Sequence, residues 1–210
     1  MEIMVRIQQS ADRLFRKFGI RSVTMDDVAK EIAISKKTIY SCFRDKNDLV
    51  STIIGSHIKQ NEETINKIIN SEANPIQRFA SIAAFIIETY EDMNPSMIND
   101  LRKFHPETFE KINEFRDSKV IQHAMKSIND GRKMGFFRDD FHEEIIARAF
   151  SSLTFFVFER PNFNDPNISK EELVVEIIKY HLRSICNENG LKELEKVNWP
   201  KKADNLSPKK

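Results

Sequence analysis

The stretch Thr24–Lys46, TMDDVAKEIAISKKTIYSCFRDK, decides how this sequence of 210 residues is interpreted. Thr24 is followed three residues later by Asp27, and Ser35 stands just before a second short helical segment. A hydroxyl in this position accepts a hydrogen bond from a free amide of the first helical turn, and an acidic residue three positions on can complete a capping box. Asp45 repeats the signal before a third helix. The stretch therefore predicts short helices joined by sharp turns.

An apolar seam is expected to fold the first of these helices across the second. Its members recur at helical spacing and are Val28, Ala29, Ile32, Ile34 and Ile39. The small side chain of Ala29 falls where the two helices should approach most closely. Caps, seam and small crossing residue together predict a helix-turn-helix.

The outward face of the second helix is basic and rich in hydroxyls. It carries Lys36, Lys37, Thr38, Ser41 and Cys42, with Tyr40 beside them. Such a helix suits the DNA major groove, where its first residues face base edges while lysines and hydroxyls hold phosphates. A solvated basic face without a partner would have the same charge, but the caps and the seam favour the DNA-binding interpretation.

Composition indicates a globular, helical protein with a sizeable core. Hydrophobic residues make up 40% and charged residues 31%, and glycine and proline are few. Together with the long helical periodicities, this predicts an all-α fold. The net charge is only +1, yet residues 1–50 carry ten Lys and Arg against seven Asp and Glu. A mildly basic first segment on a nearly neutral remainder fits a nucleic-acid module joined to another domain.

The sequence shows no targeting or membrane signal. The first residues, MEIMVRIQQSADRLFRKFG, are interrupted by charges, and no later segment is long and uncharged enough to span a bilayer. Cys42 and Cys186 lie far apart and lack metal-site spacing. We therefore expect a cytoplasmic protein with reduced thiols and no membrane partner.

Helical patterns follow one another along the chain. They cover residues 7–18, 45–70, 76–93, 96–116 with an interruption at His105-Pro106, 119–133, 143–159 and 169–185. The segment 143–159 is apolar almost all round, which predicts burial on several sides. Residues 161–166 are expected to form a loop, and the chain becomes polar after Gly190.

Three motifs in order resemble the DNA-binding domain of the TetR family of bacterial transcriptional regulators. They are "A-x-x-L-F-x-x-x-G" at residues 11–19, "T-x-x-x-[VI]-A" at 24–29 and "S-x-x-T-[LI]-Y-x-x-F-x-x-K-x-x-L" at 35–49. Two positions depart from the family pattern. Ala33 replaces the usual turn glycine, and Cys42 stands where histidine is often found, which affects the base preference.

The resemblance implies a helix-turn-helix DNA-binding domain at 1–47, a larger helical effector-binding and dimerisation domain at 48–190, and a polar tail at 191–210. It implies a homodimer joined through the last two helices; the alternative is that both are internal core. Lys36, Lys37 and Thr38 are then expected to contact bases or adjacent phosphates. The DNA backbone would be held by Thr24, Ser35, Tyr40, Ser41 and Lys46.

The resemblance also implies an unidentified small-molecule effector, apolar or amphipathic, that releases the protein from a palindromic DNA operator. Its ring contacts are unknown, with Phe85, Phe104, Phe109 and Phe155 as candidates, although core packing is the simpler role for each. The sequence contains no catalytic grouping, phosphate loop or metal-ligand pair, so no enzyme activity, cofactor or metal is expected. A ligand-responsive DNA-binding transcriptional regulator, most often a repressor in this family, is the leading hypothesis. A dimeric helical DNA-binding or protein-interaction scaffold without ligand control is the alternative.

Overall fold

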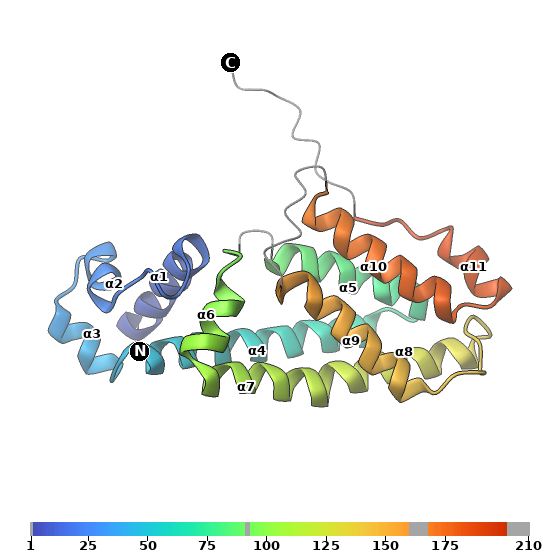
Figure 1. The fold of residues 1–210 in the computed structure, drawn as a ribbon, viewed down its shortest axis with the longest axis horizontal. Coiled ribbons are helices and arrows are strands. Elements are labelled where there is room, and N and C mark those ends of the chain that lie inside the picture. The colour runs from blue at the N-terminus through green and yellow to red at the C-terminus, as the bar shows by residue number, and fades with distance from the viewer. Residues whose placement is uncertain (1, 91–92, 160–167, 201–210) are drawn as a thin grey trace, which may run out of the picture. The chain divides into compact units, whose positions relative to one another are not determined.

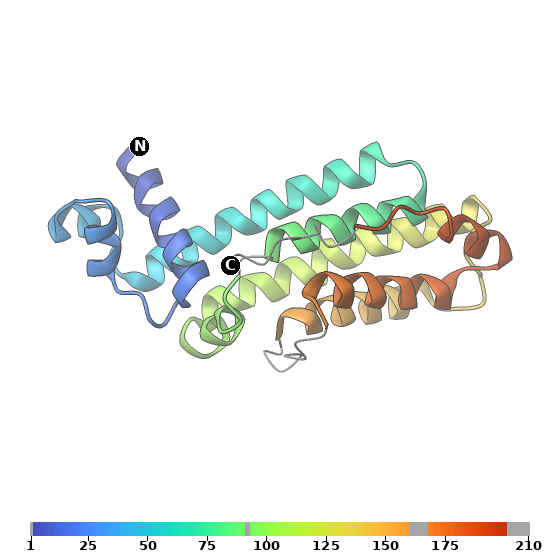
Figure 2. The same ribbon diagram turned by 90° about the horizontal axis from the view of Figure 1, so that it is seen from above.

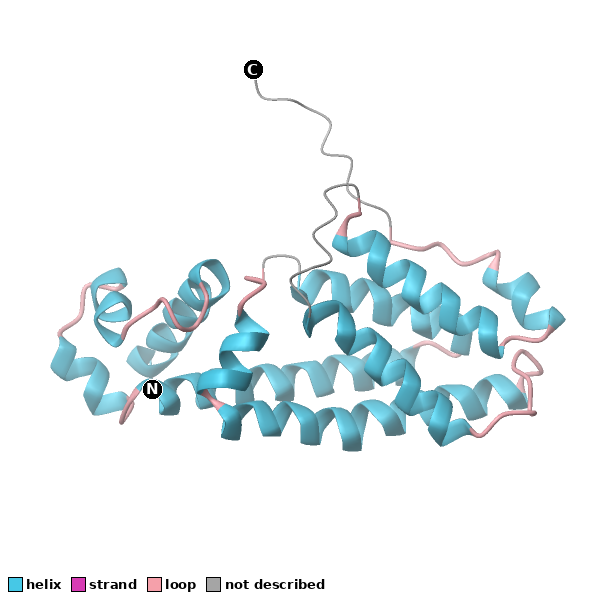
Figure 3. Ribbon diagram, in the orientation of Figure 1, coloured by secondary structure: helices cyan, strands magenta, loops and turns pink. Residues whose placement is uncertain are grey.

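The computed structural model describes residues 2–90, 93–159 and 168–200, and this part of the chain consists of helices joined by loops (Figure 3). In chain order the elements are α1 (Glu2–Phe18), α2 (Met25–Glu31), α3 (Lys36–Cys42), α4 (Lys46–Ser71), α5 (Pro75–Tyr90), α6 (Met97–Phe104), α7 (Pro106–Phe115), the π-helical η1 (Arg116–Val120), α8 (Ile121–Lys133), α9 (Glu143–Glu159), α10 (Lys170–Ile185) and α11 (Glu188–Leu194). The predicted all-α fold is confirmed. None of the described helices is both long and apolar enough to cross a membrane. The loop expected at 161–166 lies outside the described residues.

The chain forms two compact units. The first contains residues 1–67, 92–121 and 158–161, and the second contains 68–91, 122–157 and 162–210. Each unit therefore combines segments that are distant in the sequence, and each has its own buried residues.

The core of the first unit is built around α1 to α4 (Figure 1). Phe15, Ile39 and Leu49 are fully buried there, because each lies on the apolar side of an amphipathic helix. Met97 and Leu101 of α6 join the same core. The helix-turn-helix thus shares its packing with a helix from much later in the chain.

Proline and glycine end the helices of this unit where the sequence predicted. Gly19 has a φ of +81° just after α1, a left-handed conformation that glycine adopts without steric cost. The interruption predicted at His105-Pro106 separates α6 from α7, with Pro106 as the first residue of α7. In contrast, the break expected between 116 and 119 does not occur, since η1 continues from α7 directly into α8.

The second unit packs α5 against α10 (Figure 2). Aromatic rings lie between its helices. The ring of Phe79 on α5 meets that of Phe150 on α9 edge to face, with 5.1 Å between centroids. The imidazole of His181 on α10 lies 4.5 Å from the Phe150 ring. These rings hold three helices together.

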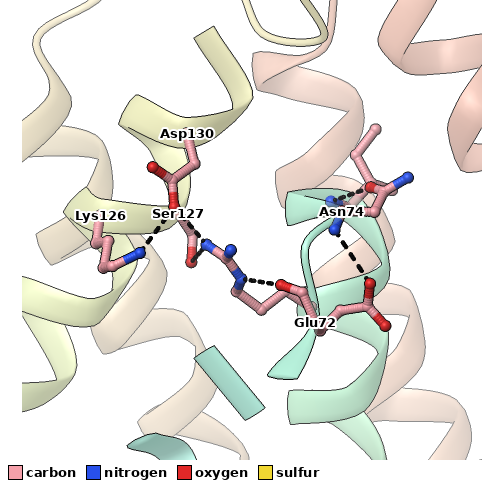
Figure 4. Close-up of polar contacts among 7 residues, drawn as sticks. Glu72, Asn74, Lys126, Ser127 and Asp130 are labelled. Carbon is pink, nitrogen blue, oxygen red and sulfur yellow. Dashed lines mark hydrogen bonds and ion pairs between the residues drawn. The ribbon is translucent and has the colours of Figure 1, made fainter. Parts of the chain in front are cut away.

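A buried arginine fixes the beginning of α5 in the same unit (Figure 4). Arg78 is only 4% exposed. Its Nε donates to the backbone oxygen of Glu72 at 3.0 Å, and its Nη1 lies 2.8 Å from Oδ2 of Asp130 on α8. Lys126 binds the same carboxylate at 3.0 Å. The guanidinium thus joins the end of α4 to α8, and its buried charge is compensated.

Helix α9 differs from its prediction. Ala147 and Phe150 are buried, but Ile145 is 63% exposed and Leu153 is also exposed. In a single chain the helix therefore keeps one apolar side uncovered, because its neighbours cover only the opposite side. The end of the chain differs too. Leu191–Leu194 belong to α11, where Leu194 is buried, so residues 191–194 are not the start of a loose tail.

Candidate nucleic-acid interface

Helix α2 begins with the predicted capping box. Oγ1 of Thr24 accepts a hydrogen bond from the backbone N–H of Asp27 at 3.1 Å, and the Asp27 carboxylate accepts one from the backbone N–H of Thr24 at 2.8 Å. The Thr24 hydroxyl also donates to Oδ2 of Asp27 at 2.6 Å, and this hydrogen bond, followed by the one from the Thr24 backbone N–H, lowers the pKa of the Asp27 carboxyl. The start of α2 is therefore fixed by its own side chains.

The turn between α2 and α3 is tight and left-handed. Ala33 has a φ of 54°, the one non-glycine residue of the described chain with a positive φ. The N–H of Ile34 donates to the carbonyl oxygen of Ala29 at 3.0 Å and closes the turn. The departure from the usual glycine at position 33 is accommodated at an energetic cost, because the Cβ atom crowds the backbone in this conformation.

Helix α3 is capped and anchored by hydroxyl groups. Oγ of Ser35 accepts from the backbone N–H of Thr38 at 3.0 Å, and Oγ of Ser41 donates to the carbonyl oxygen of Thr38 at 2.7 Å. Ile39 is completely buried beneath the helix. The opposite side of α3 is consequently held toward solvent.

The predicted DNA contacts gather on this unit, mostly in exposed positions. Thr24, Ser35, Lys36, Lys37, Tyr40 and Ser41 are exposed, whereas Thr38 and Lys46 are half-buried. Cys42 is also half-buried and packs against the core, so it does not belong to the outward face as the helical pattern had suggested. The exposed members form a basic, hydroxyl-bearing surface of the kind that binds phosphates and base edges.

Lys46 makes an intramolecular contact. Its Nζ donates to the carbonyl oxygen of Arg21 at 3.4 Å. Burial lowers the pKa of this lysine, and the nearby carboxylates of Asp100 and Asp27 oppose that shift. Lys46 thus joins the beginning of α4 to the loop between α1 and α2.

Residues at and just before the start of α6 bind the end of α1 and the loop that follows it. The N–H of Asn94 donates to the carbonyl oxygen of Arg16 at 2.9 Å, and Oδ2 of Asp100 accepts from the N–H of Arg21 at 3.0 Å. These contacts could not be predicted from local sequence patterns, because 79 residues separate Arg21 from Asp100. We call Asn94, Asp100 and the backbone that they bind the α6 clasp.

The structure also shows an ion pair that sequence reasoning missed. Nζ of Lys36 lies 2.9 Å from Oδ1 and 3.0 Å from Oδ2 of Asp26. The hydrogen bond with Asp26, followed by its charge, raises the pKa of Lys36. A lysine predicted to contact DNA therefore already has a carboxylate partner in the free protein.

The four candidate effector-binding phenylalanines do not lie together in one unit. Phe104 and Phe109 belong to the first unit, where the guanidinium of Arg21 lies 5.2 Å from the exposed Phe104 ring. Phe85 and Phe155 belong to the second unit and are half-buried. Their role in effector binding stays a prediction.

Comparison with known proteins finds a family match in the N-terminal part of the chain. Residues 7–53 match the family model described as "Bacterial regulatory proteins, tetR family". The HTH-type transcriptional regulator SAB2452 of Staphylococcus aureus is 28% identical over 140 residues, which are 67% of this chain and 61% of that protein. The HTH-type transcriptional regulator YvaF of Bacillus subtilis is 25% identical over 111 residues, which are 52% of this chain and 58% of that protein. The alignments thus span about three fifths of the length of these relatives.

The fold is shared over nearly the whole chain. A transcriptional regulator from Saccharomonospora viridis, solved in complex with choline, superposes with a TM-score of 0.77 at 19% identity. The superposition covers 89% of this chain and 99% of that one. At this identity the likeness establishes the fold, while the match to the family model covers the capped helix pair and its neighbours, residues 7–53.

Proposed function

This chain belongs, through its N-terminal domain, to the tetR family of bacterial regulatory proteins, and on that premise we propose that it is a ligand-responsive, DNA-binding transcriptional repressor. It binds a palindromic operator as a homodimer and acts in the cytoplasm. The observation that carries the proposal is the exposed face of α3. A short capped helix with Ile39 buried beneath it presents two lysines and several hydroxyls to solvent.

The proposed contacts follow the order of the helix. Lys36, Lys37 and Thr38 lie in its first turn, the part of a recognition helix that faces base edges. The remaining contacts hold the DNA backbone from around the reading helix and are made by Thr24, Ser35, Tyr40, Ser41 and Lys46. Lys46 has to exchange its carbonyl partner in the loop after α1 for a phosphate.

Dimerisation is supported by uncovered apolar side chains on α9 and α10. Ile145 and Leu153 are exposed on α9, and Tyr180 is 69% exposed on α10. Isologous pairing of these helices from two chains would bury that surface and place two reading helices on one DNA face. Half-sites about one helical turn apart fit such a two-fold arrangement.

The α6 clasp supports a route by which an effector controls the helix-turn-helix of α2 and α3, which we call the reading unit. Asn94 and Asp100 bind the backbone beside α1, so displacement of α6 would pull on the loop that leads into α2. We propose that a small apolar or amphipathic molecule binds in the helical region 48–190, as the S. viridis regulator binds choline, and weakens DNA binding. The domain limit at 47 belongs to this proposal, whereas the helical region extends through α11 to Leu194. The coupling free energy must act in both directions, so DNA must weaken effector binding equally.

Selection from a random duplex library tests this function. The purified protein is expected to enrich inverted repeats, and sedimentation is expected to give one dimer per enriched duplex. Enrichment of nothing contradicts DNA reading, and enrichment of single half-sites by monomers contradicts the two-fold arrangement. Asp100→Ala should weaken binding to the enriched duplex, because the backbone N–H of Arg21 loses its acceptor. Unchanged affinity in that variant contradicts the role of the clasp.

A further inference from the structure

We propose that Asp26 is a positioning residue of the DNA-reading face that sets sequence discrimination by holding Lys36; this inference rests on the proposed function. Asp26 lies in the first turn of α2, and Lys36 is the first residue of α3. The ion pair thereby links α2 to α3 through Lys36, a side chain of the first turn of α3 that faces base edges in the proposed complex.

The geometry is that of an ammonium group facing a whole carboxylate. Nζ of Lys36 is almost equally distant from the two oxygens of Asp26, at 2.9 and 3.0 Å. The neighbouring Asp27 closes the capping box of α2 with Thr24. Asp26 is therefore not needed for that cap, and among the described residues its carboxylate pairs with Lys36. Both side chains stay accessible, 64% exposed for Lys36 and 48% for Asp26.

An unrestrained lysine on this face would bind any phosphate within reach of its flexible stem. Such contacts strengthen binding to all sequences alike and add nothing to discrimination. A lysine held by Asp26 stays at the first turn of α3, where it can contact a base edge. By keeping Lys36 from binding phosphates, Asp26 weakens complexes with DNA of any other sequence, which are held by backbone contacts alone. Specificity is gained in this way by penalising the wrong DNA.

The size of the effect follows from the exposure of the pair. Exposed ion pairs are worth about 0.2–1 kcal/mol, which corresponds to a change in DNA affinity of roughly 1.4- to 5-fold for the DNA-binding domain of each protomer, called a head below. A dimer with two heads gives about 2- to 25-fold. If each freed Lys36 gains one phosphate, the slope of log affinity against log salt becomes steeper by about 1.8 for the dimer.

The test compares Asp26→Asn with Glu31→Gln, which removes the same charge from the exposed last residue of α2. Each protein is titrated by fluorescence anisotropy into two duplexes of about 30 base pairs, one enriched by the wild-type protein and the other its scrambled sequence. Asp26→Asn should bind the scrambled duplex about 2- to 25-fold more tightly, with the steeper salt slope and a reduced ratio of specific to non-specific affinity. Glu31→Gln should shift both duplexes by similar factors and leave the ratio unchanged.

The Lys36→Ala background decides whether Asp26 acts through Lys36. Adding Asp26→Asn to Lys36→Ala should leave the affinity ratio unchanged, since the side chain to be positioned is gone. The proposal is overturned if Asp26→Asn keeps the wild-type ratio, if Glu31→Gln reduces the ratio equally, or if the effect persists without Lys36. Thermal melts of all variants reveal any loss of folding. A wild-type protein that enriches no duplex would contradict the proposed function itself, an outcome distinct from wild-type enrichment with an unaltered ratio in Asp26→Asn.

Discussion

Replacing His181 by leucine is expected to remove part of the acid sensitivity of this protein. His181 is 4% exposed and packs beside the rings of Phe79 and Phe150. Its Nε2 has no hydrogen-bond partner among the described residues. Burial lowers the pKa of the imidazole to about 4 from its ordinary 6.5. The folded protein therefore keeps this histidine neutral at a pH where the unfolded chain protonates it.

The magnitude follows from the difference between the two pKa values. Because the folded pKa is the lower one, His181 costs no stability above pH 6.5, and stability falls as the pH decreases toward 4. At 1.36 kcal/mol per pH unit the whole loss is about 3 kcal/mol, of which roughly 2 kcal/mol falls between pH 7 and pH 5. Urea denaturation at those two pH values measures the free energy of unfolding directly.

The comparison needs a control because carboxyl groups also contribute to acid sensitivity. His142 is an exposed histidine of the same unit, so His142→Gln should show the wild-type loss between pH 7 and pH 5. Between pH 7 and pH 5, His181→Leu should lose about 2 kcal/mol less free energy of unfolding than the wild-type protein or His142→Gln. An equal loss in all three proteins would show that His181 is not held neutral in the folded state.

Two further substitutions test the turn and the buried arginine by urea denaturation. Ala33→Gly should stabilise the protein by about 0.5–1 kcal/mol, because relief of the left-handed strain exceeds the added chain entropy of glycine. The control Ala29→Gly, inside α2, should destabilise the protein. A less stable Ala33→Gly variant would refute the strain at position 33. Arg78→Met should lower the free energy of unfolding by about 2–3 kcal/mol, because Asp130 and the Glu72 carbonyl lose their buried donor. Lys126→Met, which removes the exposed partner of the same carboxylate, should lower it by less than about 1 kcal/mol. Equal losses would show that burial of the guanidinium is unimportant.

Local chemistry made the reading unit predictable from its sequence. The Thr24 and Ser35 caps, the turn at Ala33 and the break at Pro106 each depend on residues within a few positions of one another. Such signals are visible in a single sequence because short-range hydrogen bonds and backbone sterics determine them. The same applies to the buried seam through Ile39, whose helical spacing is repeated in the structure.

Contacts between distant segments could not be predicted. Asp26 and Lys36 are separated by ten residues and belong to two different helices, so no helical spacing connects them. Asp100 reaches Arg21 across 79 positions, so no periodicity connects them. The sequence left open whether the apolar surface of α9 is internal core or part of a dimer interface, because an apolar pattern does not tell whether the same chain or a second chain covers a surface.

The salt dependence of DNA binding by the wild-type protein and by Lys36→Ala/Lys37→Ala tests the central claim most directly. On the enriched duplex, the log of the wild-type affinity should fall linearly with log salt concentration. Removal of two lysines from each head should lower the affinity and reduce the slope by up to about 3.6 for the dimer. A wild-type affinity that does not change with salt, or a double variant with the wild-type affinity and slope, would contradict DNA reading by α3.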